Sequence, residues 1–236
     1  MATTAKSAKA KSAKAKAAKV EPRPVRVLVV DDHPIVREGL ARIIRNEPRL
    51  SVCGEAETAR ETLQAAEALK PDMVVLDLML KDSNGLEVIK DLQVRHPKLP
   101  VLVLSMHEEA VYAERALKAG ARGYLMKDQA RAKIAEAIRR VIDGEVYLSP
   151  VMSQAVLTSV ATGRPASTRS PVDCLTDREL EVFRMIGQGM GTKDIARRLF
   201  RSVRTIDAHR ENIKRKMGLL CATDLTQRAI AWARSE

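Results

Sequence analysis

The chain has 236 residues, of which 45% are hydrophobic and 30% are charged, a composition typical of one large or two ordinary globular domains. Its formal net charge is +11, whereas only 3% of its residues are aromatic, which argues against recognition of single-stranded nucleic acid by base stacking. The chain lacks an apolar run near the roughly 18 residues of a membrane span, and its three scattered cysteines favour reduced thiols. We therefore expect a cytoplasmic protein with no membrane partner.

The first 24 residues form a stretch rich in lysine and alanine. Residues 2–19 contain six lysines and no acidic residue, which predicts a basic, disordered tail. Such a tail attracts phosphate backbones or anionic surfaces without sequence preference, or it serves only as a solubilising extension. The sequence leaves both interpretations open.

Between residues 25 and 144, short apolar runs alternate with amphipathic segments of helical spacing. The runs typical of strands are Arg26–Val30, Val52–Cys53, Met73–Leu76, Val101–Leu104 and Gly123–Leu125. Parallel strands need crossover helices and are covered on both faces. The pattern therefore predicts an α/β domain with a five-stranded, parallel, doubly wound sheet of the flavodoxin-like kind.

Polar side chains follow four of the five predicted strands. Asp31 and Asp32 follow the first strand, Asp77 the third and Ser105 the fourth, while Lys127 comes shortly after the fifth. Taken alone, Asp77 is explained equally well as a helix or turn cap, and scattered caps could account for one or two of these residues. Because the carboxyl ends of parallel strands lie at one edge of the sheet, where ligands bind, the whole set predicts a site.

Clustered carboxylates suit a hard cation such as Mg²⁺, and an ionised Asp77 can attack phosphorus to give an acyl phosphate. Lys127 would neutralise the transferring oxygens, and Ser105 would donate a hydrogen bond. A phosphatase is an alternative, but it would normally carry a second acid where this chain has Met79. His33 follows the acidic pair, but Asp-His-Pro before a helix favours a capping turn over a metal ligand.

A change in composition separates this part from a second unit. Residues 145–172 read as a linker, with a short helix between Tyr147 and Ala161 and then a run rich in Gly, Pro, Ser and Thr. Residues 173–236 contain four helical segments and predict a small all-α domain. The expected helix caps are Thr176 (in a capping box with Glu179), Thr192, Ser202 and Thr223.

The second and third of these helices are joined by a short link around Phe200–Arg201, which suits a helix-turn-helix. The third helix carries a polar stripe opposite Ile206 and Ile213, and basic residues surround it. A solvated face is the alternative, but the basic cluster favours binding in the major groove of double-stranded DNA.

Residues 25–144 resemble a response-regulator receiver domain, because Asp31-Asp32, Leu76-Asp77-Leu78, Ser105 and Lys127 occur in the order and spacing of that family. The resemblance implies that Asp77 is the phospho-acceptor and that Asp32 and Asp77 bind Mg²⁺, with assistance from Asp31.

The same resemblance implies that Met79 contributes its backbone carbonyl to the metal and that Ser105 and Tyr124 form the switch pair. Gly85 matches the glycine of the loop after the phospho-acceptor. Lys81 departs from the family, which usually has proline there, so this loop is expected to differ in mobility or metal geometry.

Residues 173–236 resemble the LuxR-type helix-turn-helix. The matching residues are Leu175-Thr176-Asp177-Arg178-Glu179, Gly189, Lys193-Asp194-Ile195-Ala196, Leu199, Ser202, Thr205-Ile206, His209 and Lys216-Met217-Gly218. By position, the residues implied to face base edges are Asp207, Ala208 and Glu211. Those implied to approach phosphates are Lys193, Ser202, Arg204, Thr205 and Arg215. Two acids in this stripe are unexpected beside a polyanion.

Together the two units resemble a NarL/FixJ-type response regulator. This implies a transcriptional regulator, not an enzyme, that a histidine kinase phosphorylates and that binds DNA as a homodimer when active. An architectural DNA-binding protein that needs no phosphorylation is the alternative, and it would depend on the basic tail.

Overall fold

The computed structural model describes residues 23–80, 83–106, 109–162 and 172–235. Three sequence-based expectations lie outside the described residues: most of the basic tail, the effect of Lys81, and the part of the linker rich in Gly, Pro, Ser and Thr.

The amino-terminal half is built on a sheet of five strands in the order β2-β1-β3-β4-β5, and every pairing is parallel. The strands are β1 (Val25–Val30), β2 (Leu50–Ala56), β3 (Met73–Leu76), β4 (Val101–Ser105) and β5 (Gly123–Met126). The predicted parallel α/β sheet is confirmed. Strand β2 is longer than the predicted run Val52–Cys53. It lies at the edge of the sheet, and its half-exposed residues need not be continuously apolar.

Five helices cover the two faces of the sheet: α1 (Pro34–Arg45), α2 (Ala59–Leu69), α3 (Gly85–Arg95), α4 (Glu109–Ala119) and α5 (Ala130–Ile142). Helices α1 and α5 pack with Val27, Val29 and Val75 on one face. Helices α2, α3 and α4 pack on the other face, with Leu28 and Val74. Alternate residues of β1 and β3 thus face opposite layers, as the two-residue period of a strand requires.

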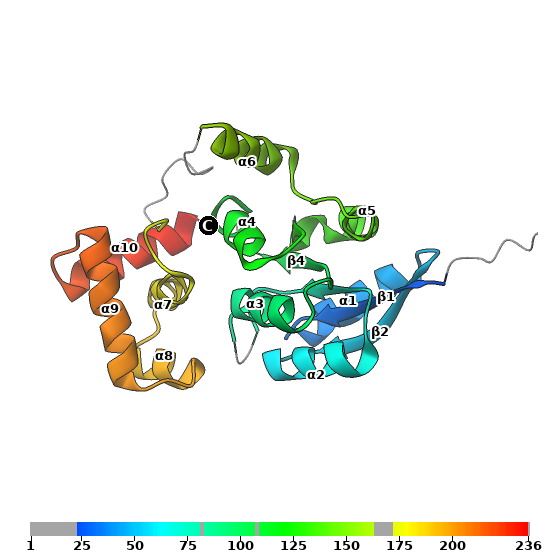
Figure 1. The fold of residues 1–236 in the computed structure, drawn as a ribbon. Coiled ribbons are helices and arrows are strands. Elements are labelled where there is room, and N and C mark those ends of the chain that lie inside the picture. The colour runs from blue at the N-terminus through cyan, green and yellow to red at the C-terminus, as the bar shows by residue number, and fades with distance from the viewer. Residues whose placement is uncertain (1–22, 81–82, 107–108, 163–171, 236) are drawn as a thin grey trace, which may run out of the picture.

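The carboxy-terminal half is helical: α6 (Pro150–Thr162), α7 (Asp177–Gly187), α8 (Thr192–Arg198), α9 (Val203–Met217) and α10 (Ala222–Ser235). Helix α7 packs against both α9 and α10, and the buried Phe183 ring lies 5.6 Å from the Trp232 ring. In Figure 1, α7 lies between α9 and the sheet domain. None of the helices within the described ranges combines the length and the apolar character needed to cross a membrane.

Two predicted caps of these helices are confirmed. Thr176 and Glu179 form a capping box at α7, since each side chain accepts a hydrogen bond from the backbone amide of the other residue. Ser202 accepts from the amide of Thr205 at 3.1 Å and so begins α9.

The other two predicted caps are wrong. Thr192 is already the first residue of α8, and Gly191 occupies the capping position. Thr223 lies inside α10, and there the Asp224 carboxylate accepts a hydrogen bond from the amide of Cys221 at 3.1 Å. A threonine in the sequence indicates where a helix begins, but it predicts the position of the capping residue only to within one or two residues.

Gly85 brings the start of α3 against the backbone that follows β3. Its amide donates a 2.7 Å hydrogen bond to the carbonyl of Leu78. A Cβ at this position would lie 2.6 Å from the carbonyl oxygen of Asp77 and 2.6 Å from Cα of Leu78. Both neighbours are backbone atoms, which have no rotamer to move to, so the close approach requires glycine.

We predict that Gly85→Ala lowers the free energy of unfolding by about 1–3 kcal/mol, because the added methyl group displaces the segment that carries Asp77. Denaturant unfolding measures this. Gly39→Ala is the matched control, since the Cβ at Gly39, inside α1, meets nothing within 4 Å. There alanine should add about 0.5–1 kcal/mol through helix propensity. Equal effects of the two substitutions would contradict the close approach.

Candidate functional site

The predicted polar residues meet at the carboxyl edge of the sheet. Asp31 follows β1, Asp77 follows β3, Ser105 ends β4, and Lys127 begins the 3₁₀ turn after β5. The Asp77 amide donates to the carbonyl of Val30 at 2.9 Å, so backbone pairing continues one residue past β3 and fixes the acid beside β1.

Lys127 joins two of the acids. Its Nζ lies 2.6 Å from Oδ2 of Asp31 and 2.7 Å from Oδ2 of Asp77, and all three side chains are buried. Asp32 adds a third carboxylate close to the same point. Three carboxylates therefore face one ammonium group, and negative charge is in excess.

Burial and charge set the protonation of this group. Burial raises the pKa of Asp77 to about 6, although the charge of Lys127 and its hydrogen bond lower it. Burial alone would lower the pKa of Lys127, but the charge of Asp77 and hydrogen bonds to Asp31 and Asp77 raise it above its usual value. The lysine therefore stays charged at neutral pH, while Asp77 holds its proton more tightly than an exposed aspartate.

The carboxylates fit a hard divalent cation. Among the described residues, the buried Oδ2 of Asp31 and Oδ1 of Asp32 pair with Lys127 and His33 and have no other hydrogen-bond partner. Oxygen ligands with excess negative charge are the environment that Mg²⁺ prefers. The Met79 amide hydrogen-bonds to the Asp77 carboxylate, whereas the role of its carbonyl as a metal ligand stays a prediction.

His33 occupies the turn that was predicted, but its ring has a different environment. The Asp31 carboxylate accepts the His33 amide at 2.9 Å and so closes the turn before α1. Within the described structure, the imidazole makes no capping hydrogen bond. Its Nδ1 lies instead 2.7 Å from Oδ1 of Asp32 and 3.3 Å from Oδ1 of Asp31.

Ser105 and Tyr124 are buried side by side on adjacent strands and share a hydrogen bond. Burial raises the pKa of the Tyr124 hydroxyl well above its usual value, so it remains protonated. The structure thus brings the predicted switch pair into contact, while its role as a switch stays a prediction.

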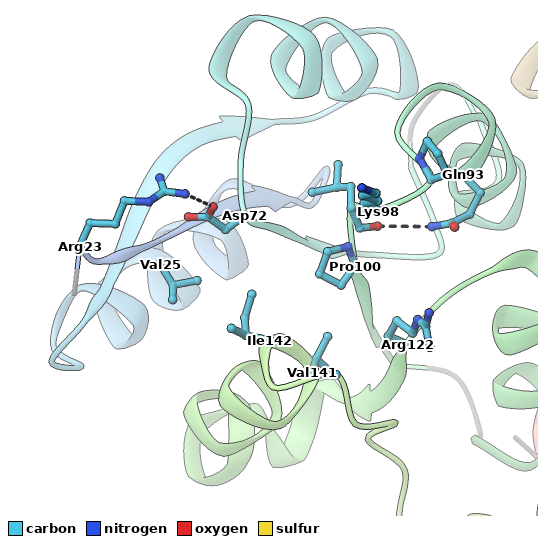
Figure 2. Close-up of a pocket in the computed structure, with 12 residues that line it drawn as sticks. Arg23, Val25, Asp72, Gln93, Lys98, Pro100, Arg122, Val141 and Ile142 are labelled. Carbon is cyan, nitrogen blue, oxygen red and sulfur yellow. Dashed lines mark hydrogen bonds and ion pairs between the residues drawn. The ribbon is translucent and has the colours of Figure 1, made fainter.

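A cavity of about 610 Å³ lies at the opposite edge of the sheet, where Asp72 and Pro100 precede β3 and β4. Figure 2 shows an ion pair between Arg23 and Asp72 at one side of this cavity, with N···O at 2.7 Å. The chemistry-bearing residues therefore lie away from this hollow. A small cation and a phosphoryl group need converging ligands more than they need a large volume.

The residues predicted to contact DNA lie on α9 and at its start, except Lys193 on α8. All but the half-buried Thr205 are exposed: Lys193, Ser202, Arg204, Asp207, Ala208, Glu211 and Arg215. Glu211 forms an ion pair with Lys214 at 2.8 Å, which reduces the conflict between this acid and a polyanion. The individual DNA contacts remain predictions.

No motif in the sequence indicated the contact between the two halves of the chain. Arg115 on α4 donates to the carbonyls of Val172 and Leu175 at 3.0 and 2.9 Å and pairs with Asp177 at 3.1 Å. Lys90 on α3 pairs with the same Asp177 at 2.9 Å. In the sequence these residues look like ordinary surface charges.

A second contact links this junction to the loop after Asp77. Asn84 caps α3 through the amide of Leu86, forms a backbone bridge with Met79 and hydrogen-bonds to Glu181 of α7. Burial raises the pKa of Glu181, and its 2.6 Å ion pair with Arg178 opposes this. The loop that follows the phospho-acceptor candidate thus touches the helical domain.

Comparisons with known proteins agree with both halves. Residues 27–139 match the response regulator receiver domain, and residues 173–229 match the LuxR family of bacterial regulatory proteins.

Two curated relatives align along most of the chain. The nitrate/nitrite response regulator NarL of Escherichia coli K12 is 34% identical over 90% of this chain and 96% of its own. The response regulator GacA of Pseudomonas viridiflava is 34% identical over 87% and 95%. A crystal structure of a LuxR-family response regulator from Aurantimonas sp. SI85-9A1 covers 58% of this chain and 99% of its own, with 33% identity and a TM-score of 0.55.

The raised pKa of Asp77 predicts that Mg²⁺ affinity depends on pH. A proton and the cation compete for the same carboxylate, so affinity should be highest above about pH 6. Below that value it should fall by roughly tenfold per pH unit, because one proton must leave. Titration calorimetry between pH 5 and 8 measures this. Asp77→Asn should bind Mg²⁺ more weakly and with a smaller pH dependence, and constant wild-type affinity from pH 5 to 7 would contradict the raised pKa.

Proposed function

Because this chain belongs to the response regulators that join a receiver domain to a LuxR-type DNA-binding domain, we propose that phosphoryl transfer to Asp77 controls its binding to double-stranded DNA. Proteins that combine these two domains are phosphorylation-dependent transcriptional regulators of two-component systems. The observation that carries the assignment of Asp77 is its buried carboxylate, 2.7 Å from Lys127 and beside two further acids.

The phosphoryl donor is a phosphohistidine of a partner kinase. One carboxylate oxygen of Asp77 forms the new O–P bond, and the N–P bond breaks with its electron pair remaining on the departing imidazole. Asp31, Asp32 and Asp77 would hold Mg²⁺, which would neutralise charge on the transferring oxygens. Lys127 supplies a fixed positive charge beside the same oxygens.

The switch begins at Ser105, which ends β4 next to the acceptor strand β3. A phosphoryl dianion on Asp77 attracts the Ser105 hydroxyl away from Tyr124. Tyr124 belongs to the same buried cluster as Val111 and Ala113 of α4, and β5 packs against this helix, so a movement of Tyr124 reaches α4. Helix α4 also carries Arg115, which binds the segment before α7.

DNA binding by α9 does not require the two domains to separate. Arg204, Asp207 and Arg215 are exposed with the described part of the receiver domain in place. Phosphorylation therefore acts by favouring a homodimer that places two α9 helices on paired half-sites. The protein works in the cytoplasm, where DNA and a kinase's phosphohistidine are accessible. Asp77 is phosphorylated and later dephosphorylated as a signal, so the protein does not act as an enzyme on a separate substrate.

The first test is labelling by a small phosphodonor in the presence of Mg²⁺. Asp77→Asn should abolish incorporation, because the amide is a poor nucleophile, and Lys127→Ala should slow it by about 10–100-fold through loss of charge stabilisation. Intact-protein mass spectrometry measures the adduct. Mg²⁺-dependent labelling of Asp77→Asn would contradict the assignment of Asp77 as the phospho-acceptor. Sustained turnover of phosphate esters would indicate a phosphatase instead.

The second test is the salt dependence of DNA binding. Contacts to phosphates require that the logarithm of affinity falls linearly with the logarithm of salt concentration. Arg204→Ala should reduce that slope by about 1, as expected for one lost phosphate contact. Arg60→Ala on α2 removes an exposed arginine of the receiver domain and should leave the slope unchanged. Fluorescence anisotropy with genomic fragments gives both values, and a salt-independent interaction would exclude this mode of binding.

A further inference from the structure

His33 lies at the solvent side of the acid cluster, with its ring directed toward the carboxylates. One ring nitrogen of His33 and one oxygen each of Asp31, Asp32 and Asp77 lie within 4.8 Å of one another. The Asp32 oxygen nearest to Nδ1, at 2.7 Å, is one of the buried atoms with no other hydrogen-bond partner among the described residues. One imidazole nitrogen thus joins the oxygens that would hold the cation.

We propose that His33 is a ligand of the cation at this site and makes it prefer Mn²⁺ and related transition-metal ions over Mg²⁺. The inference rests on the proposed function, since both involve the same cation site. It addresses which ion binds there and not the transfer of the phosphoryl group.

The backbone around His33 holds the ring at this place. The His33 amide is fixed by the carboxylate of Asp31, and Arg37 donates to the Asp31 carbonyl at 2.7 Å. Pro34 begins α1 and restricts the backbone further. The His33 side chain is 65% exposed, so a small rotation toward an ion disturbs little packing.

The chemistry of the ligand set changes with the histidine. Mg²⁺ binds oxygen and retains water molecules, so it gains little from an imidazole. Affinity for nitrogen ligands increases from Mn²⁺ through Co²⁺ to Ni²⁺. The neutral ring would present the Nδ1 lone pair and carry its proton on Nε2, while the carboxylates and Lys127 remain as they are. A Mg²⁺ ion would use the carboxylates and a water in place of the ring.

A structural role for His33 is the alternative. In that case the ring only donates a hydrogen bond to Asp32 and orients this acid, as a partner of a metal ligand does. The two roles differ in one measurable property. A ligating nitrogen couples magnetically to a paramagnetic ion, whereas a nitrogen that only orients Asp32 stays outside the coordination sphere.

The experiment uses the full chain with Mn²⁺ alone as the probe and pulsed electron paramagnetic resonance as the readout. We expect modulation from directly bound ¹⁴N in the wild type and its loss in His33→Gln. The ratio of Mn²⁺ to Mg²⁺ affinity, from competition titrations, should fall by about tenfold in the same variant. His96→Gln is the matched control, because His96 follows α3 at the other end from Asn84 and should leave both readouts as in the wild type.

Two further variants locate the ion and separate the possible failures. Asp77→Asn should weaken Mn²⁺ binding, which places the ion at the acid cluster. Mn²⁺ bound there without ¹⁴N modulation, or with an unchanged affinity ratio in His33→Gln, would overturn the role of His33 and leave the proposed function intact. A wild-type chain that binds neither Mn²⁺ nor Mg²⁺ and accepts no phosphoryl group would overturn both.

Discussion

The buried ion pairs of Lys127 with Asp31 and Asp77 are the interaction on which the rest of the structure depends. Removing such charges from water costs several kcal/mol per ion, and their mutual attraction recovers this only in part. The cluster also keeps more negative than positive charge. It is therefore poor as a stabilising device and well suited to a cation or a phosphoryl group, each of which changes the balance of charge at one edge of the sheet.

The fold supplies the rigidity that this charge requires. All four residues of β3 are buried, and pairing with β1 and β4 fixes the position at which Asp77 emerges. Gly85 then brings α3 against the same segment, and Asn84 beside it reaches Glu181 of the helical domain. Asp77 thus lies between the rigid strand β3 and a loop that contacts α7, so a change in its charge acts on the loop and not on the strand. Packed elements of this kind shift between discrete arrangements more readily than they deform.

The sequence predicted the strands, which depend on periodicity, and the site residues, which follow strand ends. It did not predict contacts between residues that are far apart in the chain. Apolar runs sufficed for five parallel strands, and polar residues after them sufficed to bring Asp31, Asp77 and Lys127 together. The caps at Thr192 and Thr223 were wrong because a neighbouring residue took the capping role. The junction between Arg115 and Asp177 had no signal, since these residues are 62 positions apart and the helix-turn-helix motif that contains Asp177 specifies no partner in the receiver domain. His33 was interpreted as part of a turn, and the direction of its ring follows only from the three-dimensional structure.

The junction between the domains explains why signalling need not uncover α9. One of its ion pairs is largely solvated, because the side chain of Lys90 is 46% exposed and that of Asp177 is 23% exposed, so this pair contributes little to holding the domains together. The polar face of α9 is already exposed in this arrangement, so uncovering it would add no affinity for DNA. In the proposed mechanism, the gain in affinity comes from joining two copies, because the second half-site is then bound at the high effective concentration that the first contact creates. Dimerisation driven by a movement of α4 would supply such a gain without any new contact between a single chain and DNA.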